Sequence, residues 1–146
     1  MVEDVGAMED RPTATLVAVV DDDDLICNSI ADLLMSAGIE SCTFSSAEEF
    51  LASSEIHEVG CLITDIRMAG MTGLELQRQL TADHSWLPII FITALGDTQL
   101  RVQALRAGAV EFLLKPVDDK VLLHSVQVAL KCVSSALGPR ESAGCQ

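Results

Sequence analysis

Apolar and polar positions along this chain form two kinds of segment that alternate. Short apolar runs bounded by turn-forming residues indicate strands buried on both faces of a parallel sheet. These runs cover residues 16–20, 39–43, 61–64, 89–92 and 110–114. Longer segments between them carry apolar residues at helical spacing and predict helices. Helices are predicted at 25–37 and 73–81, and three more after Ser45 or Ser46, after Asp97 or Thr98, and after Asp118.

The alternation of strands and helices predicts an α/β fold. Right-handed crossovers favour a doubly wound sheet of five parallel strands with five helices on its two faces. If the strand order is 2-1-3-4-5, the ligand crevice lies between the first and third strands. We expect one folded domain over residues 15–133, a flexible leader at 1–14 and a flexible, Ser/Gly/Pro-rich tail at 134–146.

Four of the predicted strands end in side chains that can handle a phosphoryl group. Asp21 and Asp22 follow the first strand, and Asp65 follows the third. Thr93 follows the fourth strand and Lys115 the fifth. Since the carboxyl ends of parallel strands meet at one edge of a sheet, we expect three carboxylates, a hydroxyl and an ammonium to gather there.

This set of groups has a specific chemical use. Three neighbouring carboxylates repel one another unless one takes up a proton or a cation lies among them, and Mg²⁺ bridges carboxylate to phosphate. Lys115 can neutralise a phosphoryl group, and Thr93 can donate a hydrogen bond to it. A carboxylate in such surroundings is a candidate nucleophile that forms an aspartyl-phosphate. Any one of these residues alone is more typical of a helix cap or another structural role.

The composition of the chain restricts its expected binding partners and its expected cellular compartment. The formal charge of −13, from 9 basic and 22 acidic residues, argues against direct binding of nucleic acid. The five cysteines are odd in number and form no Cys-x-x-Cys, which is typical of free thiols in a reducing cytoplasm. No apolar stretch reaches the roughly 18 residues of a membrane span, and residues 1–13 lack the pattern of a signal peptide.

Four segments together make the chain resemble a known family. They are residues 19–23, residues 64–68, Thr93-Ala94, and the run from Gly108 to Lys115-Pro116, whose last bond is a candidate cis peptide. Over residues 15–133 the chain resembles the receiver domain of two-component response regulators. It is most similar to receivers fused to helix-turn-helix output domains. The resemblance implies a flavodoxin-like fold and a signalling role rather than that of a turnover enzyme.

The resemblance also implies roles for individual residues. Asp65 would accept a phosphoryl group from the phosphohistidine of a sensor histidine kinase or a phosphotransfer protein. Asp21 and Asp22 would hold Mg²⁺ together with Asp65, and the backbone carbonyl of Arg67 would be a further ligand.

The remaining implied roles concern the response to phosphorylation. Lys115 would pair with a phosphoryl oxygen, Thr93 would bind the phosphate, and Phe112 would turn inward behind it. The fourth helix, fifth strand and fifth helix would then present a changed face to a downstream partner or to a second copy of the chain.

Three features bear on how this chain departs from the family pattern. Ala69 stands where the family usually has proline, so we expect a looser loop after Asp65. Arg67 and Leu95 flank the approach of water to the phosphorus, and neither is suited to activate it, so slow autodephosphorylation is expected. No DNA-binding segment follows residue 133, which leaves two alternatives: a single-domain regulator, or a receiver fragment of a longer DNA-binding transcriptional regulator.

Two further alternatives remain open on sequence alone. A haloacid-dehalogenase-like phosphatase also uses a strand-end Asp-x-Asp, a threonine, a lysine and later acids, which Asp21, Asp23, Asp118 and Asp119 mimic around Thr93 and Lys115. That reading leaves Asp65 without a role and offers no room for a cap domain. A receiver-like interaction module that never takes phosphate is the other alternative, and the complete set of site residues argues against it.

Overall fold

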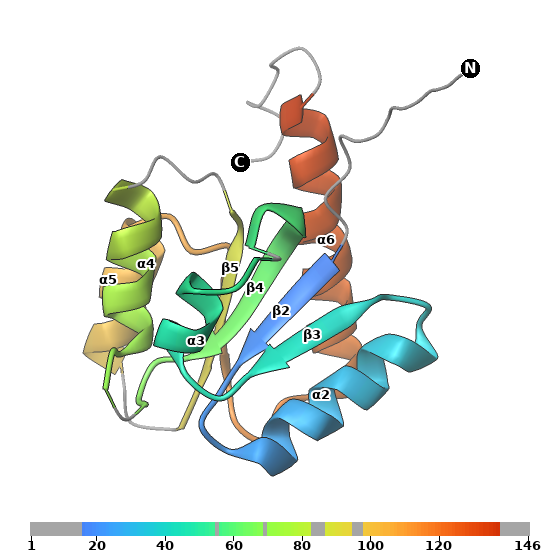
Figure 1. Ribbon diagram of the computed structural model, residues 1–146, viewed down its shortest axis with the longest axis horizontal. Coiled ribbons are helices and arrows are strands. Elements are labelled where there is room, and N and C mark those ends of the chain that lie inside the picture. Colours follow the sequence, from blue (N-terminus) through green and yellow to red (C-terminus); the bar gives the residue numbers. More distant parts are fainter. Residues whose placement is uncertain (1–15, 55, 69, 83–86, 95–97, 138–146) are drawn as a thin grey trace.

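Figure 1 shows the computed structural model of the protein, which describes residues 16–54, 56–68, 70–82, 87–94 and 98–137. Strands and helices alternate along the chain, as the hydrophobic pattern predicts. In order they are β2 (Leu16–Val20), α2 (Asp24–Ser36), β3 (Ser41–Phe44), α3 (Ala47–Leu51), the 3₁₀ turn η1 (Ile56–Glu58), β4 (Val59–Asp65), α4 (Gly73–Ala82), β5 (Ile89–Thr93), α5 (Thr98–Arg106), β6 (Glu111–Leu114) and α6 (Asp119–Leu137).

The five strands form one parallel sheet in the order β3-β2-β4-β5-β6. Numbered along the chain, this is the order 2-1-3-4-5, so the predicted doubly wound α/β fold is confirmed. β2 lies beside β4, with Val20 opposite Thr64, and β4 lies beside β5, with Asp65 opposite Ile92. The first and third strands of the chain are therefore neighbours, and the topological switch point lies between their ends.

Helices cover both faces of the sheet (Figure 1), and each face has its own apolar core. Alternate residues of a strand point to opposite faces. Val17 and Val19 of β2 pack with residues of α2 and α6, whereas Ala18 and Val20 pack with residues of α3, α4 and α5. β4 is buried along all seven of its residues, which explains why its sequence reads as a continuous apolar run.

Local capping sets several of the helix boundaries. Asp23 is the N-cap of α2, its carboxylate accepting a bond from the backbone N–H of Leu25, so the helix begins at Asp24 rather than at the predicted residue 25. Ser46 caps α3. At the other end of the chain, α6 runs to Leu137, past the start of the tail expected from residue 134. The expected leader at 1–14 lies outside the described residues, as does the tail beyond residue 137.

Within the described part of the chain, no helix combines the length and apolarity that crossing a bilayer requires.

Candidate functional site

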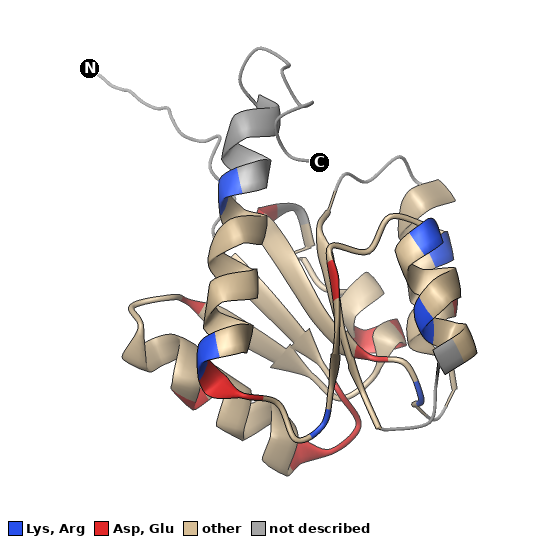
Figure 2. Ribbon diagram, turned by 180° about the vertical axis from the view of Figure 1, so that it is seen from behind, with Lys and Arg blue, Asp and Glu red and all other residues tan. Residues whose placement is uncertain are grey.

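The side chains predicted to act together come from the carboxyl ends of neighbouring strands. Asp21 follows β2, Asp65 closes β4, Thr93 closes β5 and Lys115 follows β6. The backbone N–H of Lys115 donates to the carbonyl of Thr93 at 2.8 Å, which extends the β5–β6 pairing to the edge of the sheet. Figure 2 shows acidic segments gathered at this edge, with a basic segment among them.

Lys115 joins two buried carboxylates. Its Nζ lies 2.9 Å from Oδ2 of Asp65 and 3.2 Å from Oδ2 of Asp21. Asp21 is 3% exposed and Asp65 is 8% exposed. Residues 94 and 50 positions apart in the chain thus meet in one ion-pair cluster. Two carboxylates and one ammonium give this cluster a formal net charge of −1, and both carboxylates are largely buried.

Burial and neighbouring charges shift the pKa values of Asp21 and Lys115. Burial raises the pKa of Asp21 above its ordinary value, and the charge of Asp65 raises it further, while the N–H of Asp23 and the Lys115 ammonium oppose the shift. Burial lowers the pKa of Lys115, but its hydrogen bond to Asp65 and the two carboxylate charges outweigh that effect, so the net shift is upward. Lys115 therefore stays protonated at neutral pH.

The backbone around Asp21 orients its carboxylate. The N–H of Asp23 donates to Oδ1 of Asp21 at 2.9 Å, leaving Oδ2 for Lys115. The thiol of Cys27 donates to the carbonyl of Asp21 at 3.3 Å from within the first turns of α2. The side chain of Asp22, between these residues, is exposed.

The loop after Asp65 is closed on itself by backbone contacts. The N–H of Arg67 donates to Oδ1 of Asp65 at 3.3 Å, and the N–H of Gly73 donates to the carbonyl of Ile66 at 2.8 Å. Ile66 and Met68 are buried and anchor the loop in the core. The backbone of Arg67 is therefore held next to the carboxylate that sequence analysis selected.

Glu48 holds the far side of this loop, and sequence reasoning missed it. Its Oε2 accepts the N–H of Met71 at 3.0 Å. Gly70 has φ +77°, and a Cβ built there would lie 2.9 Å from the same oxygen. An exposed glutamate in a five-residue helix carries no sequence signal of such a contact, because only the fold brings α3 beside the loop.

Gly73 permits the closest backbone contact of the site. A Cβ at this position would lie 2.3 Å from the carbonyl oxygen of Asp65 and 2.9 Å from Cα of Ile66. We expect Gly73→Ala to lower the free energy of unfolding by about 2–3 kcal/mol, because backbone cannot move aside as a flexible side chain can. Urea denaturation measures this, with Thr81→Ala on the exposed part of α4 as the control. A loss no larger than that of the control would contradict the expected clash.

Thr93 and Phe112, which are expected to change conformation on phosphorylation, lie in the core beside the site. Thr93 is fully buried and Phe112 is 7% exposed. The ring of Phe112 packs against that of Phe91, with centroids 6.3 Å apart, and the two residues are paired in the register of β5 and β6. Phe112 is therefore directed into the core on the same face of the sheet as α4 and α5.

Comparison with known proteins decides the family. The family model described as the response regulator receiver domain matches residues 17–127. The chain belongs to the response regulator receiver domain family. This confirms the resemblance drawn from the four sequence segments.

The relatives of this receiver domain are response regulators. Response regulator protein TodT of Pseudomonas putida is 41% identical over 124 residues, which cover 85% of this chain and 54% of TodT. Transcriptional regulatory protein FixJ of Azorhizobium caulinodans is 40% identical over 119 residues, covering 82% of this chain and 56% of FixJ. The chain thus spans about half the length of these curated relatives.

Solved structures agree with the fold of the receiver domain. The response regulator StyR superposes with a TM-score of 0.79 at 43% identity, covering 88% of this chain and 65% of that one. The structure of FixJ-N gives a TM-score of 0.74 at 37% identity, covering 85% of this chain and 96% of that one.

The side chains predicted to hold a metal ion are Asp21, Asp22 and Asp65. Among the residues that the structure describes, no three His, Cys, Asp or Glu side chains come together as a metal site. Asp21 and Asp65 share Lys115, and the third predicted carboxylate, Asp22, is exposed beside them. The donor set consists of carboxylate oxygens with a net negative charge, which fits a hard divalent cation such as Mg²⁺.

Other predicted residues have structural roles or lie elsewhere. Asp23 caps α2, and Asp118 caps α6 by accepting bonds from the N–H groups of Lys120 and Val121 at 2.8 and 3.2 Å. Both acids thus have structural roles, and the match to the receiver domain model does not favour the phosphatase alternative. Ala69 and Leu95 lie outside the described residues.

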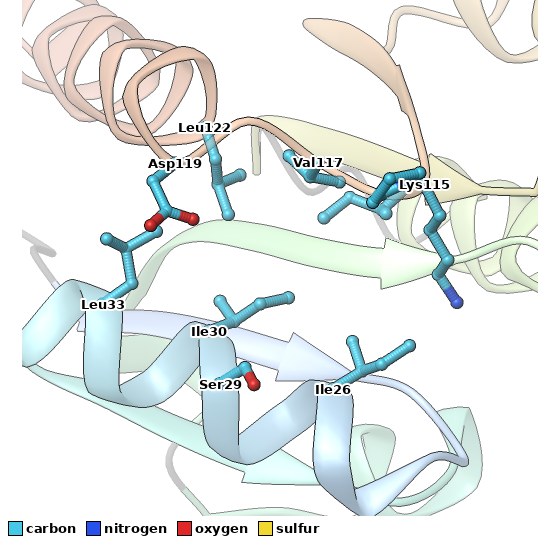
Figure 3. Close-up of a pocket in the computed structure, with 10 residues that line it drawn as sticks. Ile26, Ser29, Ile30, Leu33, Lys115, Val117, Asp119 and Leu122 are labelled. Carbon is cyan, nitrogen blue, oxygen red and sulfur yellow. The ribbon is translucent and has the colours of Figure 1, made fainter.

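A pocket of about 430 Å³ lies beside the site of the receiver domain, between α2 and the start of α6 (Figure 3). Ile26, Ile30 and Leu33 line it from α2, and Val117 and Leu122 line it from the opposite side. The side chain of Lys115 extends from the rim of this pocket toward the carboxyl ends of the strands. The apolar lining of the pocket continues into the core, where Ile30 and Leu122 are buried in one cluster.

Proposed function

We propose that Asp65 of this receiver domain accepts a phosphoryl group from the phosphohistidine of a sensor histidine kinase or a phosphotransfer protein. The observation that carries this proposal is the buried carboxylate of Asp65, held 2.9 Å from the ammonium of Lys115 at the sheet edge. In the reaction, the bond from phosphorus to the histidine nitrogen breaks as a bond to a carboxylate oxygen of Asp65 forms. The histidine is the leaving group, and the product is an aspartyl-phosphate.

Mg²⁺ is the proposed cofactor of this transfer. Asp21, Asp22 and Asp65, with the backbone carbonyl of Arg67, would hold the ion. When bound, Mg²⁺ neutralises charge that develops on the phosphoryl oxygens. The net charge of −1 on the Asp21–Lys115–Asp65 cluster supports this assignment, because a phosphoryl group would add further negative charge to it.

Lys115 and Thr93 have complementary parts in the proposed reaction. Formation of the acyl phosphate would remove the charge from the carboxylate of Asp65, so the ammonium of Lys115 would become available to a phosphoryl oxygen. The hydroxyl of Thr93 would donate to another such oxygen, and Phe112 would follow the movement of Thr93. These changes would alter the neighbouring α5 and β6.

Incubation with acetyl phosphate tests the function directly. With Mg²⁺ present, we expect the intact mass of the protein to rise by one phosphoryl group, and with EDTA we expect no rise. No gain under either condition would refute the proposed function, whereas an equal gain in EDTA would refute the role of the metal.

Mg²⁺ should also raise the melting temperature without any phosphodonor. Binding to the native state alone stabilises it by about 2.7 kcal/mol at a concentration one hundredfold above Kd. We expect Asp22→Asn to weaken this Mg²⁺-dependent shift, and Asp24→Asn, an exposed acid in the first turn of α2, to leave it unchanged. Equal shifts in the two variants would remove Asp22 from the proposed ligand set.

A long-lived aspartyl-phosphate is proposed as well. Hydrolysis needs a water positioned in line with the phosphorus, and neither Arg67 nor Leu95 is suited to activate one. We expect Leu95→Glu to accelerate loss of the phosphoryl group, followed by intact mass over time, with Leu95→Met as the control. Decay at the wild-type rate in Leu95→Glu would show that Leu95 does not limit the access of water.

The proposed signalling face consists of α5, β6 and α6. Its exposed apolar side chains support a partner: Val102 is 45% exposed, Leu105 39% and Leu114 45%. We propose that this face contacts a downstream protein, a further domain or a second copy of the chain after phosphorylation, without direct contact with nucleic acid. The cytoplasm is the proposed compartment, supported by the free thiols of Cys27 and Cys61.

A further inference from the structure

Gln77 is a polar side chain buried in an apolar cluster. It lies on α4, is 2% exposed, and its Nε2 donates to the carbonyl oxygen of Ala104 on α5 at 3.1 Å. The surrounding cluster includes Leu76, Leu80 and Phe112. Burial of a side-chain amide is costly unless it is hydrogen-bonded, so this bond fixes how α4 and α5 sit against each other.

The first residue of α4 lies in close contact with the backbone of Asp65. Gly73 begins α4, and its Cα lies so close to the backbone of Asp65 that a Cβ there would lie 2.3 Å from the Asp65 carbonyl oxygen. Gln77 follows Gly73 by four residues, so the two share one face of the helix. One turn of α4 therefore connects the backbone of Asp65 with the backbone of α5.

Few other side chains hold α5 in place. Of its side chains that the structure describes, Ala104 is the one that is fully buried, and Leu100 is partly buried against the same cluster. Val102 and Leu105 are exposed. With so little apolar contact, a single buried hydrogen bond is a large part of what sets the position of this helix.

We propose that Gln77 is a positioning residue that couples α5 to the phosphoacceptor loop through α4. This connection is a hydrogen bond between α4 and α5, whereas Thr93 lies on β5 and Phe112 on β6. The role of this connection in carrying the signal rests on the proposed phosphorylation of Asp65. Its role in holding α5 in position does not depend on that reaction.

The bond can be removed without leaving a buried acceptor unpaired. The carbonyl of Ala104 also accepts the N–H of Ala109 at 3.0 Å. Gln77→Met conserves the volume of the side chain and deletes only the amide, so most of the stability should remain. Gln79→Met makes the same substitution on the exposed side of α4 and is the matched control.

Hydrogen exchange without any ligand tests the tether. In Gln77→Met, we expect exchange in the peptide that covers 98–106 to rise by roughly tenfold, the effect of losing one buried hydrogen bond. Exchange in β2 and β4 should stay at the wild-type rate, and Gln79→Met should match wild type throughout. Wild-type exchange in α5, or an equal rise in α5, β2 and β4, would overturn the proposal. Gln77→Leu takes the place of Gln77→Met if that variant does not fold.

Saturation with Mg²⁺ and beryllium fluoride, a phosphate mimic, tests the coupling. We expect the mimic to change the exchange of α5 in the wild type and to change it less than half as much in Gln77→Met. A full response of α5 in Gln77→Met would overturn the coupling. Failure of the wild type to bind the mimic would refute the proposed function instead, while the ligand-free comparison would still decide whether Gln77 tethers α5.

Discussion

We expect Asp65→Asn to abolish transfer of a phosphoryl group from acetyl phosphate to the protein. Asparagine keeps the shape of the side chain and one of its oxygens, so the site can persist, but an amide oxygen is not a nucleophile for phosphorus at neutral pH. Intact mass after incubation with Mg²⁺ measures the effect, and the expected yield is below detection. The wild type, at the same protein concentration, should gain one phosphoryl group.

The control for this variant is Asp24→Asn, which removes an exposed acid from the first turn of α2. It should be phosphorylated like the wild type. Undiminished yield in Asp65→Asn would show that another residue is the acceptor, and the assignment of Asp65 would then be wrong. Loss of phosphorylation in both variants would point to damage to the fold, which a melting curve of each variant would reveal.

We expect Lys115→Met to lower the free energy of unfolding by about 3 kcal/mol at pH 8. Removal of one partner from a buried ion pair leaves an uncompensated charge, which typically costs about 3–5 kcal/mol, and partial exposure of Lys115 places the expectation at the low end. Asp21 and Asp65 would then face each other without the ammonium. Urea denaturation measures the loss, with Lys120→Met on the exposed first turn of α6 as the control.

The loss should shrink as the pH falls. The pKa of Asp21 is already raised in the folded protein, so the folded state binds a proton more tightly than the unfolded state does. Stability associated with this group therefore falls as pH rises from the ordinary carboxyl pKa through the raised one. Without Lys115 the pKa of Asp21 should rise further, and its protonation at lower pH should relieve the repulsion. An equal loss at pH 5 and pH 8 would contradict this explanation.

The raised pKa of Lys115 affects stability in the alkaline pH range. Its partners favour the protonated form in the folded state, so its contribution to stability is complete at neutral pH and is lost only when the pH rises through its folded pKa, above the ordinary value for lysine. Both groups therefore contribute less to stability as the pH rises, Asp21 in the acidic range and Lys115 in the alkaline range.

The order of elements and the location of the site followed from local sequence patterns. A strand buried on both faces must be a continuous apolar run, so β4 was recognisable from Cys61 to Thr64 without its neighbours. Parallel strands end at a common edge, which brought Asp21, Asp65, Thr93 and Lys115 to one place before any distance was known. The boundaries shifted by one or two residues where a cap decided them, as at Asp23.

Contacts between distant segments depended on the tertiary structure. Nothing in a five-residue helix marks Glu48 as the residue that holds Met71, and nothing in the stripe of α4 marks Gln77 as the donor to Ala104, 27 residues away. Likewise, the strand ends predicted that Asp21, Asp22 and Asp65 would be neighbours, but only the backbone turn after β2 decided that Asp21 is buried against Lys115 while Asp22 is exposed. The physical reason is the sequence distance over which each effect acts. Periodicity and capping involve residues a few positions apart. The direction of a side chain in a loop or on a helix face depends instead on which other elements pack against it.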